Sequence, residues 1–219
     1  MLKRVSLYAS AVLLGLTCFS FVLLSSRGAS AENAVVSDVL ISIPVACTMT
    51  GTGMNSHNAT INPGTYQADI GSTTLKVLCN DANGFAIYAI GYTGQTYGTT
   101  TLVGANSNQT IATGTGTSGT SQWAMKLNTN ANATYAVSLD NGYGAYSLVP
   151  GSYTKVAHRD SATDIGTNAT GAELSTTYAA FIASTQASDT YNGKVKYTMV
   201  HPSNDTPPVE VACANNMIW

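Results

Sequence analysis

Cysteine, histidine and tyrosine are the residue types of this chain that could do chemistry or hold a ligand. Cys47, Cys79 and Cys213 follow a long apolar leader, which itself contains Cys18. In an oxidising compartment Cys47 and Cys79 are the natural pair, and their bridge would close a loop of about 32 residues. Two unpaired buried thiols are the alternative. Cys213 is then left over, either free or cross-linking two copies.

The three histidines do not form a metal or catalytic motif. His57, His158 and His201 lie in polar or terminal segments, without a cysteine or second histidine at ligand spacing. A zinc site needs three or four converging ligands, so we expect neither a metal nor a cofactor. The chain also contains no Gly-x-Ser-x-Gly motif. We therefore predict a protein that is not an enzyme; a secreted hydrolase is the remote alternative, and a pocket gathering His158, Asp160 and a serine would favour it.

Tyrosines are the best candidates for ligand contacts. Tyr92 and Tyr97 flank a glycine-containing turn, and loops at the end of a β-sandwich commonly carry recognition residues. We predict that these two tyrosines bind a ligand, either a surface glycan or a protein. For the other prominent aromatic residues we expect positions in the core or at its rim; these are Tyr88, Trp123, Tyr143 and Tyr146.

The first 31 residues have the organisation of a secretion signal. Lys3 and Arg4 precede an apolar stretch from Val5 to Leu24, and Ala29-Ser30-Ala31 is the small-x-small pattern that a signal peptidase accepts. An uncleaved membrane anchor is the alternative, because about 20 apolar residues can span a bilayer. We expect a secreted or cell-surface protein that touches a membrane only through this segment.

The rest of the chain is poor in charge. Charged residues make up 9% of the sequence, and beyond residue 31 six basic residues stand against 11 acidic ones. Such a balance does not favour nucleic-acid binding, which needs clustered Lys and Arg. Thr, Ser, Asn and Gly replace the ions, a composition that suits extracellular β-proteins.

Short alternating segments predict strands along most of the chain. The sequence predicts a first strand over Val36–Ile43, ended by Pro44. It predicts a hairpin of Thr73–Cys79 and Phe85–Tyr92 around Asn83-Gly84, because an Asn-Gly step supplies positive φ. A second hairpin is predicted around Asp140-Asn141-Gly142. Further strands are expected at 122–127 and 194–200. The segment 173–183 could be strand or helix, and its β-branched and aromatic residues favour strand.

This pattern of short strands without an amphipathic helix predicts an all-β fold. We expect an antiparallel β-sandwich, immunoglobulin-like or pilin-like, with long Gly/Thr/Asn-rich loops. The expected organisation is a signal peptide over 1–31, a sandwich domain over 32–202 and a Pro-containing linker or tail over 203–219.

Several segments resemble a group of secreted and surface β-sandwich proteins of very small, host-attached bacteria. They are Ala46-Cys47-Thr48-Met49, the stretches Thr73–Asn80 and Asn83–Tyr92, and Tyr197-Thr198-Met199-Val200-His201-Pro202. The resemblance implies a surface protein. It also implies a shortened member of the group, because in those proteins a further module often follows the position that corresponds to Cys213.

A weaker similarity is to fimbrial subunits and spore-coat protein U. In those sandwiches a Cys near the first strand bridges a Cys at the end of the second, a pattern that Cys47 and Cys79 match. The chain departs from the pilin pattern in having no clear amino-terminal donor strand, although Val35–Ile43 could act as one. The expected function is structural or adhesive, by loops presented for recognition. A carbohydrate-binding or pilin-like appendage module lacking its effector domain, with self-association, is the alternative.

Overall fold

The computed structural model describes residues 41–53, 57–93, 96–115, 119–130, 134–166, 168–202 and 206–208. The predicted signal peptide and Cys213 lie outside these residues. The chain divides into two compact units, Met1–Ile43 and Pro44–Trp219. Of the first unit only residues 41–43 are described, and they form no strand. Strands β1 to β12 all belong to the second unit.

A seven-stranded sheet forms one layer of this unit, in the order β1-β2-β10-β7-β6-β5-β11. Its longest strands, β2 and β10, are antiparallel neighbours whose register shifts near Tyr178. β6 pairs with β7 in parallel. The bounds of the seven strands are β1 Cys47–Thr52, β2 Thr65–Cys79, β5 Leu102–Gly104, β6 Thr110–Thr113, β7 Gln122–Thr129, β10 Ala172–Ile182 and β11 Tyr191–Asn192.

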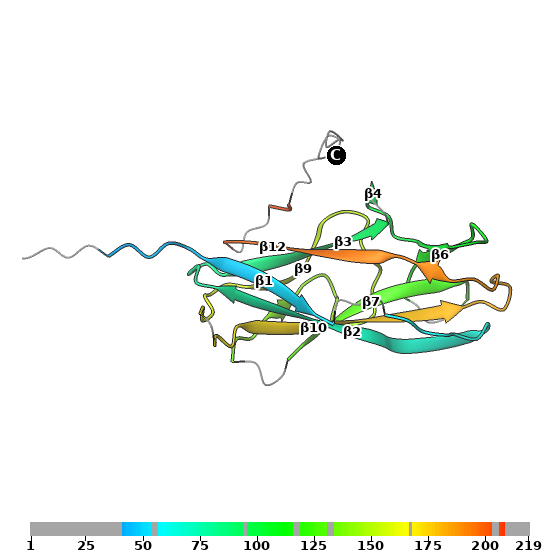
Figure 1. Cartoon of the computed structure of the whole chain (residues 1–219), viewed down its shortest axis with the longest axis horizontal. Coiled ribbons are helices and arrows are strands. Elements are labelled where there is room, and N and C mark those ends of the chain that lie inside the picture. The colour runs from blue at the N-terminus through cyan, green and yellow to red at the C-terminus, as the bar shows by residue number, and fades with distance from the viewer. Residues whose placement is uncertain are drawn as a thin grey trace, which may run out of the picture. The chain divides into compact units, whose positions relative to one another are not determined.

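The second layer is a five-stranded antiparallel sheet. Its main order is β12-β3-β9-β8, and the short β4 pairs with the end of β3. Figure 1 shows β3, β9 and β12 on one side of the unit and β2, β7 and β10 on the other. The bounds are β3 Phe85–Thr93, β4 Thr96–Tyr97, β8 Ser138–Leu139, β9 Thr154–Arg159 and β12 Lys194–Val200.

Apolar side chains from both sheets meet in one core. Val77, Leu127 and Leu174 of the seven-stranded sheet belong to the same buried cluster as Ile87 and Val156 of the five-stranded sheet. All five are 0% exposed, which is the burial that the alternating patterns predict. The predicted all-β sandwich is therefore confirmed. Within the described residues there is no helix of the length and apolar character needed to cross a membrane.

The first predicted hairpin is wrong, although both of its strands exist. β2 pairs with β1 and β10, whereas β3 pairs with β12 and β9, so the Asn83-Gly84 turn carries the chain from one sheet to the other. The turn itself forms as expected, with Asp81 accepting a hydrogen bond from the Asn83 amide at 2.9 Å. A turn sequence is a local signal, so it predicts that the chain reverses direction but does not predict which strands pair. Burial of apolar residues on facing strands decides in which sheet each strand pairs.

The second predicted hairpin is also wrong. β8 pairs with β9, and the segment after Gly142 runs beside β7 instead, where Ser147 and Met125 exchange backbone hydrogen bonds of 2.9 and 3.0 Å. The predicted first strand fails over its described part, since β1 starts only at Cys47. The strands predicted at 122–127, 173–183 and 194–200 are confirmed as β7, β10 and β12.

Candidate functional site

Tyr92 and Tyr97 lie side by side in the structure. Tyr92 is near the end of β3 and Tyr97 is in β4, and the two residues are direct cross-strand partners. Cross-strand partners bring their side chains close together on one face of a sheet. The ring centroids are 5.3 Å apart, with an angle of 21° between the ring planes. The strand pairing thus joins the two residues that the sequence indicates as ligand contacts.

Two lysines of β12 complete this cluster. Lys194 is the partner of Tyr92 on the other edge of β3, and its Nζ lies 5.3 Å from the centre of the Tyr92 ring. Lys196 lies two residues further along, with its Nζ 4.7 Å from the centre of the Tyr97 ring. Both distances are within the range of cation–π attraction. We call Tyr92, Tyr97, Lys194 and Lys196 the tyrosine–lysine cluster.

The tyrosine–lysine cluster is partly accessible to solvent. Tyr97 is 40% exposed, Lys194 is exposed and Tyr92 is half-buried. The two rings stack on each other, so part of the aromatic surface that a sugar ring could cover is occupied. What the cluster offers to a ligand is chiefly its two ammonium groups and two phenolic hydroxyls, which are hydrogen-bond donors.

The other prominent aromatic residues are structural, as the sequence predicts for core or rim positions. Tyr88, Trp123 and Tyr143 are 2%, 6% and 5% exposed. The indole Nε1 of Trp123 donates a hydrogen bond of 2.8 Å to the carbonyl of Thr100. Tyr146 bonds to the Asp69 carboxylate at 2.7 Å.

His158 lies between two carboxylates. Its Nδ1 is 2.7 Å from Asp140 and its Nε2 is 3.6 Å from Asp160. A Ser-His-Asp triad also holds Nδ1 with a carboxylate, but its Nε2 faces the serine hydroxyl. Ser138 is the cross-strand partner of His158, yet Nε2 is directed at Asp160. The His158 ring is thus flanked by two carboxylates, and this arrangement does not supply the contact between a base and a nucleophile.

The other two histidines also have local partners. His57 Nε2 lies 2.9 Å from the Thr73 hydroxyl, and His201 Nδ1 lies 3.5 Å from Asp81. In the described part of the chain, no three His, Cys, Asp or Glu side chains converge in a way that could hold a metal ion.

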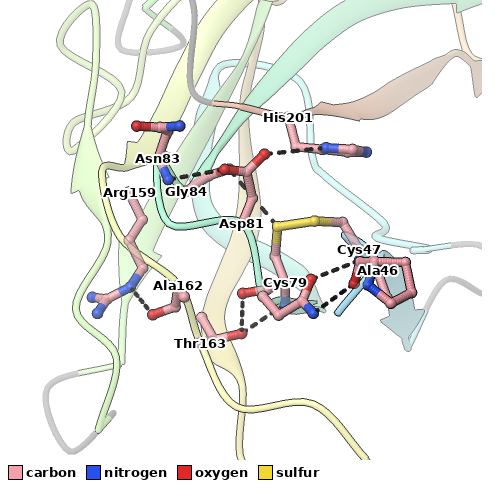
Figure 2. The surroundings of a disulfide bond; sticks show 12 residues. Ala46, Cys47, Cys79, Asp81, Asn83, Gly84, Arg159, Ala162, Thr163 and His201 are labelled. Carbon is pink, nitrogen blue, oxygen red and sulfur yellow. Dashed lines mark hydrogen bonds and ion pairs between the residues drawn. A yellow bond between two sulfur atoms is a disulfide. The ribbon is translucent and has the colours of Figure 1, made fainter. Parts of the chain in front are cut away.

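The disulfide joins β1 to β2 at the end of the sandwich where β3 begins. Cys47 and Cys79 are direct cross-strand partners with Cα atoms 4.0 Å apart, and they are bonded to each other. Figure 2 shows the bridge beneath Asp81 and His201, with Thr163 beside Cys79. The Cys79 amide donates a hydrogen bond of 2.8 Å to the Thr163 hydroxyl. The predicted bridge is confirmed, and it indicates an oxidising compartment.

The lysines of the tyrosine–lysine cluster are the part of the site that sequence reasoning missed. The alternation of Lys194 and Lys196 with Val195 and Tyr197 gives the face on which the lysines lie. It does not identify β3 as the neighbouring strand, and β3 is about a hundred residues earlier in the chain. The turn dipeptide Asn192-Gly193 before β12 does not identify the strand that pairs with β12 either.

Comparison with known proteins adds no relative. Neither a scan against models of protein families nor a search of curated proteins finds a match to this chain.

Proposed function

We propose that this chain is an exported protein with a structural or adhesive role on a bacterial cell surface. The signal-like leader and the disulfide between Cys47 and Cys79 support export. The low share of charged residues supports a surface built from hydroxyl and amide groups. The proposed role is non-catalytic, since the His158 ring is held between Asp140 and Asp160.

The tyrosine–lysine cluster supports the part of this proposal that concerns ligand recognition. Its tyrosines sit on paired strands of a sandwich, so their rings are held by the backbone of β3 and β4. A rigid aromatic pair at the surface gives contact area at a small cost in conformational entropy, which is why tyrosine is common in recognition surfaces. The proposed ligands are surface glycans, or proteins, of the host or of neighbouring cells.

A glycan array tests this recognition role. We expect saturable binding by the mature protein and loss of that binding in Tyr97→Ala, because one ring of the stacked pair is removed. Tyr66→Ala is a matched control, since Tyr66 is 41% exposed against 40% for Tyr97 and lies in the other sheet. Binding unchanged in Tyr97→Ala, or lost equally in both variants, would overturn the proposal for this cluster.

Export is tested separately by the intact mass of the natural protein, before and after reduction. We expect a chain that lacks the leader and gains two mass units on reduction of the bridge in each monomer. Recovery of the protein from the cytosol with its leader and free thiols at Cys47 and Cys79 would refute export.

An appendage subunit is the second candidate function, and one observation favours it. Ile41 and Ile43 are both 77% exposed and Val45 is 54% exposed, at alternate positions just before β1. An apolar face repeating every second residue fits a strand that pairs with another chain. We expect concentration-dependent polymers by light scattering, which Ile41→Asp/Ile43→Asp abolishes and Ile165→Asp leaves intact. A monomer at every concentration would exclude this candidate.

A further inference from the structure

The five-stranded sheet carries an excess of positive charge, whereas the chain as a whole is acidic. Its strands β3, β4, β8, β9 and β12 contain no Asp or Glu. They contain four of the six Lys and Arg residues in the described part of the chain: Lys155, Arg159, Lys194 and Lys196. Because only 9% of the residues are charged, this concentration of positive charge on one sheet favours the binding of an anionic partner there.

Three of these cations are on the face of the sheet turned away from the core cluster, where Tyr88 and Ile90 of β3 are themselves only 2% and 5% exposed. Phe85, Ile87 and Ala89 of β3 belong to the core, so the alternate residues of β3 lie on the opposite face. The strand register sets Lys155 opposite Tyr88, Lys196 opposite Ile90 and Lys194 opposite Tyr92. Cross-strand partners share a face, so Lys155 lies on the same face of the sheet as the tyrosine–lysine cluster.

In the described part of the chain, two acidic side chains that directly follow strands of this sheet lie at its other end. Asp140 and Asp160 follow β8 and β9 and flank His158, which is the cross-strand partner of Ala86 at the start of β3. Lys194 pairs with Tyr92 near the far end of the same strand. An anionic ligand at the tyrosine–lysine cluster would therefore meet cationic groups and be kept away from these carboxylates.

We infer that the tyrosine–lysine cluster binds an acidic polysaccharide through carboxylate groups on its sugars. This inference rests on the proposed recognition function and names its ligand class. The ammonium groups of Lys194 and Lys196 bind the carboxylates, and the hydroxyls of Tyr92 and Tyr97 bond to sugar hydroxyls. A polysaccharide fits better than a nucleic acid, because the few lysines here fall short of the clustered cations that phosphate backbones require.

Because the charged groups are in contact with solvent, the strength of this binding should depend on salt and on the number of contacts. Each contact between an exposed ammonium and a carboxylate is weak in water and is screened by salt. A polymer with many carboxylates compensates by rebinding at neighbouring sugars, which raises its apparent affinity. We therefore expect binding that is strong for polymers, weak for single sugars and sensitive to ionic strength.

Polygalacturonate and its fully methyl-esterified form are a matched pair of probes, because they share one backbone and only the first carries charge. We expect the mature protein to bind immobilised polygalacturonate at about 20 mM salt and to lose most of that binding at about 500 mM. Binding to the methyl ester should be at least about tenfold weaker, because the ester carries no negative charge to pair with the ammonium groups.

Lysine variants locate the site. Lys194→Gln/Lys196→Gln should weaken binding by about tenfold or more, whereas Lys194→Arg/Lys196→Arg should keep it, since charge is preserved. Lys126→Gln is the control, because the Lys126 ammonium lies 5.3 Å from the Tyr146 ring centre, a similar pair on the other sheet. Thermal unfolding of each variant checks that the fold is intact, and a variant that fails this check is replaced by the single Lys194→Gln.

The outcomes separate this inference from the proposed function. Equal binding of both polymers, or binding that Lys194→Gln/Lys196→Gln leaves unchanged, overturns the acidic ligand and leaves glycan recognition standing. Binding to polyglutamate in preference to polygalacturonate overturns the polysaccharide as the occupant. Absence of binding to either polymer, together with an array without signal, overturns both proposals.

Discussion

At the scale of the residue, carboxylates in this charge-poor chain hold loops in place. Asp189 accepts hydrogen bonds from the Asn106 amide at 2.9 Å and the Ser107 amide at 2.7 Å, and so ties the turn after β5 to the segment before β11. The Ser107 hydroxyl and these amides lower the pKa of Asp189 below its ordinary value of 3.8. Asp164 acts in the same way on the amides of Thr170 and Gly171.

The depressed pKa of Asp189 predicts a pH-dependent contribution to stability. A carboxyl whose pKa is lower in the folded state stabilises the fold above its unfolded pKa, and the contribution is lost as the pH falls through the folded value. We expect Asp189→Asn to lower the melting temperature at pH 7. We also expect the gap to wild type to narrow as the pH falls below 3.8, because the unfolded wild-type chain then binds a proton at this carboxyl before the folded protein does.

Melting curves of wild type and variants from pH 7 down to about pH 2 check this prediction. Asp160→Asn is the control, since the Asp160 side chain is 74% exposed. Equal losses for the two variants at pH 7, or a gap for Asp189→Asn that stays constant with pH, would contradict the assigned role.

Sequence reasoning reached some residues of the site and missed others for a clear reason. Cys47 and Cys79 could be paired because few cysteines are available, and Tyr92 and Tyr97 stand out because a glycine-containing turn lies between them. Lys194 reaches the same site only through the pairing of β12 with β3. Such a long-range contact is set by burial across the whole fold, and a local pattern does not contain it.

At the scale of the element, the turn between β2 and β3 depends both on its local sequence and on a close contact with a strand that is distant in the sequence. Gly84 has φ of +72°, a conformation that an Asn-Gly turn provides. A Cβ at Gly84 would collide with the backbone carbonyl of Arg159 at the end of β9. The glycine therefore serves two needs: the local turn, and the close approach of the backbone of another strand. The sequence signal predicts only the first of them.

Two glycine variants separate these needs. Gly142 has φ of +77°, and no atom beyond its chain neighbours lies within 4 Å of the position that a Cβ would take, so Gly142→Ala should cost only the backbone strain of about 1–2 kcal/mol. Gly84→Ala should cost about 3 kcal/mol or more, because the collision with Arg159 adds to the same strain. Denaturant unfolding measures both free energies. Equal losses for the two variants would show that Gly84 is needed for its φ alone.

At the scale of the whole molecule, the fold class was predictable and the strand pairing was not. Alternating apolar residues in segments such as Gln122–Leu127 and Lys194–Val200 predict strands with one buried face, and this is enough for an all-β sandwich. Both predicted hairpins fail because the segments on the two sides of each turn pair in different sheets. Their apolar faces meet across the core, as Val77 of β2 and Ile87 of β3 do. The core is thus shared between the two sheets.

A shared core predicts that the two sheets unfold together. Leu174 of β10 and Ile87 of β3 are fully buried in the same cluster, so Leu174→Ala and Ile87→Ala should each destabilise the protein by about 2–5 kcal/mol. Both variants should shift one common transition in scanning calorimetry, because loss of either sheet exposes the core of the other. Leu148→Ala, at a side chain that is 54% exposed, should change stability by only about 0.5 kcal/mol. Two separate transitions, each moved by one core variant, would show that the sheets are independent folding units.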